Sequence, residues 1–508
     1  MRLRPALAVI ALLGLTGAAT ALGATSGTPL GDYALFHHGL GQGPLHPTAV
    51  AYAAPGMGRT PQTRCAKGSR PETSIQGRVP LRDYQTGRFK AGYTCNLTDI
   101  GHEGDSGGFQ VHRYVDKVGH ECGFYDGTLL FPANEPNSPG GVVVLDMHNP
   151  AHPVRTAVLS TLAMKTPHES FRLNAARGLL AAVAGSPATQ VGQVDVYDAS
   201  ADCRHPVFKS SLPLGILGHE GAFSPDGKTY WAATTADRGL SAIDLTNPAV
   251  PQLLMHSFMI ATHGLSVSDD GKRLYLADVQ SDRGVQQNYV TEITHGGGGM
   301  RILDATPIQN RTIGTTDLKE IGYVSWPEVT IPQSTIPVTI RGHKYLVEFD
   351  EYDSNTTAYS PDENVGGVRI IDIGNEHAPK VISRIRLAVW ERAARVADAN
   401  DPGASSGTQG YAAHYCAVPQ RKEPGILACS LITSGMRVFD IRDPFHPREV
   451  AYANHPGAIT GNSVSPGGGD AMSAPAFVPA RREIWYADGN TGFWVERLTA
   501  AAWPTAHR

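Results

Sequence analysis

The sequence predicts an all-β fold, a seven-bladed β-propeller made of four-stranded antiparallel blades. A strand-like segment that ends in aspartate recurs roughly every 50 to 70 residues, a spacing that suits one four-stranded blade per repeat. A second motif, a histidine that opens an apolar strand, recurs with it. The 56 glycines and 36 prolines among 508 residues indicate many short strands joined by turns.

The beginning of the chain predicts a secretory signal peptide. Arg2 and Arg4 precede an apolar run, and residues 19–21 read Ala-Thr-Ala, a small-residue cleavage pattern. We therefore expect a secreted or periplasmic protein that has lost residues 1–21. No later stretch has the roughly 18 continuous apolar residues of a membrane-spanning helix, so we expect no membrane span. The remaining chain divides into an irregular N-terminal extension (22–92), the propeller (93–498) and a C-terminal tail (499–508).

The charge of the chain argues against nucleic acid as a partner. The formal net charge is −4, and the sequence contains no basic run. Phosphate backbones are bound by clustered Lys and Arg side chains, which this sequence lacks. We expect a monomer whose ligand is a small molecule, a protein or a glycan.

Six cysteines in an exported chain predict disulfides before metal ligands. Cys416 and Cys429 flank a Gln-Arg-Lys-Glu-Pro-Gly turn, so they could face each other across a hairpin. This pair is the one we predict. A nearest-neighbour assignment of the others pairs Cys65 with Cys95 and Cys122 with Cys203, which is one of about fifteen connectivities.

The repeat that sets the period is a glycine, four mostly apolar or alternating residues, and an aspartate. Copies occupy residues 141–146, 239–244, 299–304, 367–372 and 435–440, with a looser copy ending at Asp198 and a terminal copy without the aspartate at 492–497. These seven copies predict seven blades. Asn-Pro, Asp-Pro or a similar turn usually follows the aspartate, so we expect this side chain to cap the turn through bonds to backbone amides.

The repeat resembles that of the LVIVD-repeat β-propellers, in which a hydrophobic strand ends in Asp before a Pro-containing turn. The resemblance covers residues 108 to 498 and implies a propeller without implying a chemistry. A second pattern, seen at 219–228 (HEGAFSPDGK) and 263–272 (HGLSVSDDGK), is more distantly similar to selenium-binding proteins and methanethiol oxidases. That resemblance implies channel histidines that bind copper and oxidation of a small molecule.

In each predicted blade, the innermost strand starts at the histidine and the third strand is the Gly-to-Asp segment. The segment from Tyr93 to Gly101 could then close the ring as the outer strand of the seventh blade. Five histidines share the opening position, which lies at the mouth of the central channel: His120, His168, His219, His263 and His414. The two blades without histidine place Ser334 or Thr335 and Ser473 there.

Imidazoles that converge on one point suit a transition metal, and we expect copper before zinc. The alternative is a hydrated channel mouth in which the histidines bond to water, carbonyl groups and one another. Glu121, Glu169 and Glu220 each follow one of these histidines and could orient the imidazoles or act as a base. Neighbouring strand residues point to opposite faces, so both can face the axis only where the backbone is irregular.

The long insertions of the chain lie on the face where the innermost strands begin, at 279–298, 351–366 and 391–409. Binding residues concentrate in loops that a rigid scaffold positions, so we expect the ligand on that face. Glu348, Asp350 and Glu351 form an acidic group at the end of a strand, which we assign to a solvated turn rather than a cation site.

The leading hypothesis is an exported propeller that binds a transition metal through some of the five histidines, and whether it is an enzyme stays open. If it is one, we expect a metal-dependent oxidoreductase that acts on a small molecule. The alternative is a non-catalytic propeller that binds a protein, peptide or glycan through its long-loop face.

Overall fold

The computed structural model describes residues 58–504, apart from short internal gaps. The gaps are residues 128–139, 186–191, 217, 235–238, 259, 261, 279–298, 313, 316, 327–330, 352–364, 405–409 and 460–466.

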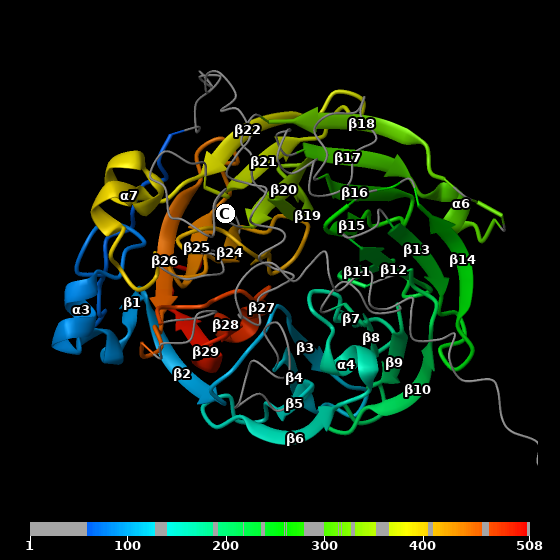
Figure 1. Cartoon of the computed structure of the whole chain (residues 1–508), viewed down its shortest axis with the longest axis horizontal. Coiled ribbons are helices and arrows are strands. Elements are labelled where there is room, and N and C mark those ends of the chain that lie inside the picture. The colour runs from blue at the N-terminus through cyan, green and yellow to red at the C-terminus, as the bar shows by residue number, and fades with distance from the viewer. Residues whose placement is uncertain are drawn as a thin grey trace, which may run out of the picture.

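Seven antiparallel sheets stand in a closed ring around a central channel, so the predicted seven-bladed β-propeller is confirmed (Figure 1). The strands are given from the channel outward. Blade 1 contains β3 (Val111–Val115), β4 (Glu121–Asp126), β5 (Val142–Asp146) and β6 (Val154–Leu159). Blade 2 contains β7 (Arg172–Asn174), β8 (Leu179–Val183), β9 (Val194–Asp198) and β10 (Val207–Leu212). Blade 3 contains β11 (Glu220–Phe223), β12 (Thr229–Thr234), β13 (Gly239–Asp244) and β14 (Gln252–Ser257).

The other four blades include the two that the N-terminal strands join. Blade 4 contains β15 (Leu265–Val267), β16 (Arg273–Asp278), β17 (Gly299–Asp304) and β18 (Glu320–Ser325). Blade 5 contains β19 (Ile331–Ile340), β20 (His343–Glu351), β21 (Val368–Asp372) and β22 (Lys380–Ile385). Blade 6 contains β23 (Cys416–Ala417), β24 (Ile426–Ser430), β25 (Met436–Asp440), β26 (Arg448–Asn454) and β1 (Tyr93–Cys95). Blade 7 contains β27 (Ala476–Val478), β28 (Glu483–Asp488), β29 (Gly492–Leu498) and β2 (Leu97–Glu103).

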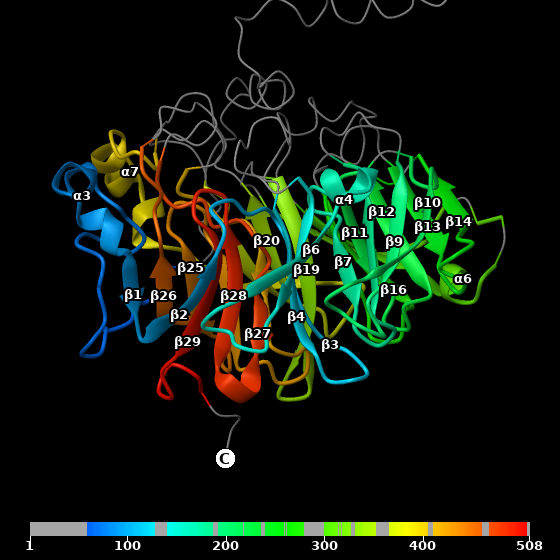
Figure 2. The ribbon, with the colours of Figure 1, turned by 90° about the horizontal axis from the view of Figure 1, so that it is seen from below.

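Short helices lie between or beside the blades. They are α3 (Leu81–Thr86), α4 (Leu162–Lys165), α6 (Thr306–Gln309) and α7 (Arg392–Asp398), with the 3-10 turns η1 (Arg88–Ala91), η2 (Ala388–Trp390) and η3 (Pro479–Arg481). Figure 2 shows α4 and α7 at one face of the ring and the turn between β3 and β4 at the other. We call these the entry face, where innermost strands begin, and the short-turn face. Among the described residues no helix is long and apolar enough to cross a membrane.

The segment expected to close the ring serves two blades. β2 pairs with β29, with Leu97 opposite Leu498, and is the outer strand of blade 7 as predicted. Residues 93–95 instead form β1, which pairs with β26 as a fifth strand of blade 6. Each blade buries apolar side chains against the next, as where Val183 and Val194 of blade 2 pack with Tyr230 and Ile243 of blade 3.

The repeated aspartates cap turns, as predicted. Each accepts a hydrogen bond from the backbone N–H two residues later, over 2.7–3.1 Å, in six successive blades. The residues concerned are Asp146, Asp198, Asp244, Asp304, Asp372 and Asp440. The Ser-x-Asp-Gly-Lys turns are similar, because Asp226 accepts from the Lys228 amide and Gly227 has a φ of 66°. Only glycine adopts that left-handed φ without strain.

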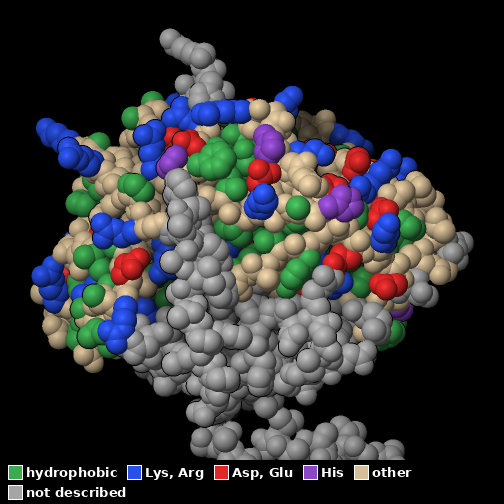
Figure 3. Space-filling view, turned by 90° about the horizontal axis from the view of Figure 1, so that it is seen from above, with side chains coloured by type: hydrophobic (Ala, Val, Ile, Leu, Met, Phe, Trp, Pro, Cys, Tyr) green, Lys and Arg blue, Asp and Glu red, His purple; other side chains and the backbone are tan. Residues whose placement is uncertain are grey.

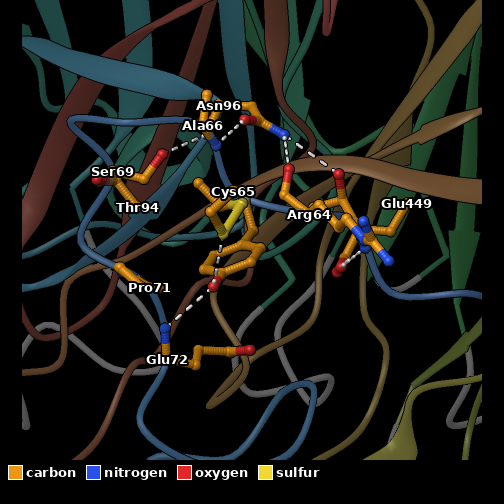
Figure 4. The surroundings of a disulfide bond; sticks show 12 residues. Arg64, Cys65, Ala66, Ser69, Pro71, Glu72, Thr94, Asn96 and Glu449 are labelled. Carbon is orange, nitrogen blue, oxygen red and sulfur yellow. Dashed lines mark hydrogen bonds between the residues drawn. A yellow bond between two sulfur atoms is a disulfide. The ribbon is translucent and has the colours of Figure 1, made fainter.

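All three disulfides of the nearest-neighbour assignment are present, and the predicted Cys416–Cys429 pair joins directly opposite residues of β23 and β24. The Cys65–Cys95 bridge ties the N-terminal extension to β1 (Figure 4). Beside it the Asn96 side chain donates to the carbonyl of Arg64 and accepts from the Ala66 amide. The extension is therefore fixed along blade 6.

The rim at the top of Figure 1, beyond β18 and β22, intersperses acidic and basic side chains (Figure 3). A polyanion would need clustered cations. This part of the rim offers mixed charge instead.

His112, on the innermost strand of blade 1, gives the fold a component of acid sensitivity. Burial lowers its pKa to about 4, although its Nε2 bonds to the Phe171 carbonyl over 3.0 Å. The unfolded chain binds a proton near pH 6.5, so stability is lost as the pH falls from about 6.5 towards 4.

We therefore expect the wild type to lose up to about 2 kcal/mol more than His112→Gln between pH 7 and pH 5. Urea unfolding at both pH values measures this difference. His446→Gln, at a largely exposed histidine, serves as the control. Equal losses in wild type and His112→Gln would contradict the prediction.

Candidate metal centre

Four of the five predicted histidines meet at the entry end of the channel. They lie a few residues or less before the innermost strands of blades 2, 3, 4 and 6 and are His168, His219, His263 and His414. Neighbouring rings lie close, with centroids 4.3 Å apart for His168 and His219 and 4.5 Å apart for His219 and His263. His168, His263 and His414 are buried, and His219 is nearly so.

The fifth histidine, His120, was placed wrongly from the sequence. It opens β4, the second strand of blade 1, and lies in the β3–β4 turn on the short-turn face. There its Nδ1 bonds to Asp116 over 2.8 Å, with Asp202 3.5 Å away. The prediction took β4 for the innermost strand of this blade. The innermost strand is β3, and no histidine stands directly before it. Phe109 lies there instead, with its ring 4.7 Å from His168 and 5.3 Å from His414.

Three carboxylates join the four imidazoles, and only two of them follow a histidine in sequence. Glu169 and Glu220 are fully buried in the cluster, as is Glu351 at the end of β20. The prediction that Glu121 stands beside the channel histidines is wrong. Glu121 pairs with Arg113 and Arg481 on the blade 1 side of the short-turn face.

The assignment of Glu348, Asp350 and Glu351 to a solvated turn is also wrong, since all three are buried. Glu348 and Asp350 pair with Arg369, whereas Glu351 reaches the histidines. Of the two positions where the histidine series is broken, Ser334 donates to Glu220, and Ser473 accepts from the Ala487 amide.

Irregular backbone lets histidine and glutamate neighbours enter the same space. His168 has a φ of 47°, in the left-handed region, so Glu169 need not turn away from the axis. Glu220 has room because residue 264 is glycine. A Cβ at Gly264 would lie 1.6 Å from the Oε2 atom of Glu220.

The donor atoms form a closed circuit of contacts, which we call the His–Glu ring. Its five contacts are His219 Nε2 to His263 Nε2 (3.0 Å), His263 Nε2 to Glu351 Oε1 (3.2 Å), Glu351 Oε2 to His414 Nε2 (3.2 Å), His414 Nε2 to Glu169 Oε1 (3.4 Å) and Glu169 Oε2 to His219 Nε2 (3.5 Å). His168 lies at the edge, with its Nε2 3.9 Å from Glu169. Each of blades 2 to 6 thus contributes at least one side chain to the cluster.

These contacts fit the edges of a metal coordination shell. Bonds of about 2.1 Å place neighbouring ligand atoms roughly 3.0 Å apart at right angles and roughly 3.4 Å apart in a tetrahedron. Both oxygens of Glu169, which belong to the ring, also have no hydrogen-bond partner among the described residues. Buried polar atoms are ordinarily satisfied, so a ligand for them is expected.

The electrostatics of the cluster divide the imidazoles into two kinds. Burial lowers the pKa of His168 to about 3 and that of His219 well below its ordinary value. Burial also opposes charge on His263 and His414, but Glu169 and Glu351 outweigh it. They raise the pKa of His263 well above its ordinary value and that of His414 to about 9.

The same attraction acts on the carboxylates. Burial alone would raise the pKa of Glu169 and Glu351, yet His263 and its neighbours hold both below the ordinary range. Glu220 is compensated separately, by Arg172 at 2.7 Å. No motif histidine stands beside Arg172 or Glu351, so the sequence did not point to Arg172, and it pointed to Glu351 only as part of the acidic group assigned to a solvated turn.

The three long loops that the sequence predicts on the entry face are described only in part. Residues 279–298 lie outside the described residues, as do 352–364 of the second loop and 405–409 of the third. Within the third loop, residues 392–398 form α7.

The variant Gly264→Ala tests how tightly Glu220 is packed beside the His–Glu ring. The added Cβ would collide with Glu220 Oε2 and with the Gln333 carbonyl oxygen, 2.3 Å away. We expect a loss of roughly 1 to 3 kcal/mol in unfolding free energy, measured by urea denaturation, because overpacking displaces a buried charge. In a Glu220→Ala background the same Gly264→Ala change should cost less than it does in the wild type, because the carboxylate it collides with is gone. Gly58→Ala, where a Cβ meets nothing within 4 Å, is the control, and equal effects of the two alanines would contradict the prediction.

Comparison with known proteins finds similarity in fold only. No protein-family profile matches the chain, and no curated protein matches it. Hydrazine synthase of Kuenenia stuttgartiensis is 13% identical, with a TM-score of 0.47 over 79% of this chain and 97% of that one. The periplasmic gluconolactonase PpgL of Pseudomonas aeruginosa is 13% identical, with a TM-score of 0.47 over 80% and 92%. The β-propeller domain of Myceliophteria thermophila Cps50 (Swd1) is 12% identical, with a TM-score of 0.45 over 79% and 98%. These similarities indicate no substrate or activity for this chain.

Proposed function

We propose that the His–Glu ring binds one transition-metal ion through Glu169, Glu351 and some of His168, His219, His263 and His414. The closed circuit of five donor contacts at 3.0–3.5 Å is the observation that carries the proposal. His120 lies outside this ring, on the short-turn face beside Asp116 and Asp202.

The charge of the cluster supports one divalent ion rather than two. Three buried carboxylates, Glu169, Glu220 and Glu351, are opposed by one guanidinium, that of Arg172. With neutral imidazoles, the form that binds metals, two negative charges remain. One divalent cation balances them, whereas a second would leave a buried excess of positive charge, which is costly.

Copper is the ion that we propose first. Imidazole nitrogen suits copper, zinc and iron, and for a given set of nitrogen and oxygen donors copper(II) binds more tightly than zinc. A copper ion here would supply one-electron redox chemistry, which the resemblance to methanethiol oxidases makes relevant to a small-molecule substrate. Glu169 and Glu351 would hold such an ion together with the imidazoles.

We also propose that the protein is exported. The signal-like start of the sequence and the three disulfides support this, because disulfides persist in oxidising compartments. Metal loading would then take place outside the cytoplasm or during export.

Metal analysis of the exported protein tests the proposal. We expect about one equivalent of copper per chain, and background metal in His219→Ala/His263→Ala, because the 3.0 Å contact between their Nε2 atoms lies in the ring. His446→Ala is the matched control on the surface. Elemental analysis after incubation with copper or zinc, with the melting temperature before and after chelation, provides the measurement.

Two results would contradict the proposal. One is a native protein that stays at background after incubation with either ion. The other is a folded double variant that retains its full metal content. Zinc bound in place of copper would support the metal site and contradict the proposed redox role.

A further inference from the structure

Two acidic side chains lie directly opposite each other in the strand pairing that closes the propeller. Asp99 of β2 is the register partner of Glu496 of β29, on the blade 7 side of the closure (Figure 1). Residues directly opposite in antiparallel strands have neighbouring side chains on one face of the sheet, and like charges there are destabilising. Glu496 is fully buried and Asp99 is half-buried. Two ionised carboxylates at this place would repel each other.

A buried histidine from the neighbouring blade completes the group. His455 directly follows β26 of blade 6, and its Nε2 lies 2.9 Å from Glu496 and 3.6 Å from Asp99. The indole of Trp494 stacks on this imidazole with ring centroids 3.7 Å apart, which fixes its orientation. One donor atom from each of the three side chains lies within 4.8 Å of the others. We call Asp99, His455 and Glu496 the closure cluster.

The positive charge at the closure cluster falls short by one. The Arg70 guanidinium, from the N-terminal extension, contacts Asp99 at 2.5 Å. Burial lowers the pKa of His455 to about 4, so this imidazole is neutral at pH 7 and can donate its Nε2 hydrogen to Glu496. One guanidinium therefore faces two carboxyl groups. A buried carboxylate without a compensating charge is costly, and a proton removes that cost.

The two carboxyl groups are placed so that one proton serves both. Burial, and then the charge of Asp99, raise the pKa of Glu496 well above its ordinary value, and a hydrogen bond between the two carboxyls acts in the same direction. Arg70 opposes this shift without cancelling it. Oε2 of Glu496 and Oδ1 of Asp99 are both buried and have no donor among the described residues. A proton between the two groups supplies the missing donor.

The other titratable groups around the cluster change their charge at other pH values. Burial raises the pKa of Asp488, on β28, to about 6. Burial also raises the pKa of Tyr486, on the same strand, well above its ordinary value, so this phenol stays neutral at pH 9. His102 packs on the Trp494 ring and bonds to a backbone carbonyl. Between pH 7 and pH 9, a comparison that changes only Glu496 therefore reports on this carboxyl.

We propose that Asp99 and Glu496 share one proton, and that this proton controls the closure of the propeller. The closing strand β2 is then held most firmly in mildly acidic surroundings. Loss of the proton leaves two carboxylates opposite each other in the closing pair, so β2 loosens in alkaline surroundings. This inference requires no metal in the His–Glu ring.

Proton linkage gives the sign of the pH dependence. Unfolded Glu496 loses its proton near pH 4.5, whereas the folded chain keeps it to a much higher pH. The unfolded state therefore binds fewer protons in this range, and stability falls as the pH rises. Between pH 7 and pH 9 we expect the unfolding equilibrium constant of the wild type to rise by up to about tenfold more per pH unit than that of Glu496→Gln.

Urea unfolding of chelator-treated full-length protein measures this difference. Glutamine keeps the shape of Glu496 and its hydrogen bonds but exchanges no proton. Asp99→Asn is the second variant, because its amide donates to an ionised Glu496 without repelling it, and we expect it to have a smaller pH dependence than the wild type. Glu391→Gln, at a side chain that is 48% exposed, is the matched control and should behave as the wild type does.

Hydrogen exchange locates the effect on the closing strand. After correction for the intrinsic exchange rates, we expect the wild type to lose protection in β2 relative to Glu496→Gln as the pH rises. Protection of β13 in blade 3 should be the same in both proteins. Equal pH dependence of unfolding in the wild type and in both variants overturns the shared proton. Protection that falls equally in β2 and β13 overturns the control of closure.

Discussion

Everything at the centre of this molecule depends on one long-range pairing, that of the N-terminal strand β2 with β29 near the C-terminus. This pairing places the N-terminal strand β2 in the last blade and so closes the ring of seven sheets. Closure also fixes the first strands of the blades around a common axis. Only then do His168 of blade 2 and His414 of blade 6 lie within reach of the same carboxylate, Glu169.

The closing strands are themselves held by the N-terminal extension. Cys65–Cys95 anchors residue 65 beside β1, and the buried ion pair of Arg437 with Glu72 joins the extension to blade 6. Removing one partner of a buried pair leaves an uncompensated charge, at a cost of about 3 to 5 kcal/mol. The N-terminal extension therefore helps to hold the closing strands of the propeller in place, although it contains no blade of its own.

Next to the His–Glu ring lies a cavity that Arg172, Ser334 and Tyr415 line. Arg172 compensates the charge of Glu220 and also lines this cavity. Gly264 makes this arrangement possible, since any side chain there would fill the space of the Glu220 carboxylate.

The sequence by itself determined the seven-fold repeat, the turn-capping aspartates, the disulfide between Cys416 and Cys429, and four of the five channel histidines. These features are local, because strand alternation, Asx turns and hairpin pairing involve residues close in the chain. The tertiary structure decided the rest. His120 and Glu121 follow the same local pattern but open a second strand, and only the strand pairing of blade 1 distinguishes the two registers. Glu351 and Arg172 belong to the site because ring closure carries separate blades to one axis, a condition that no short stretch of sequence records.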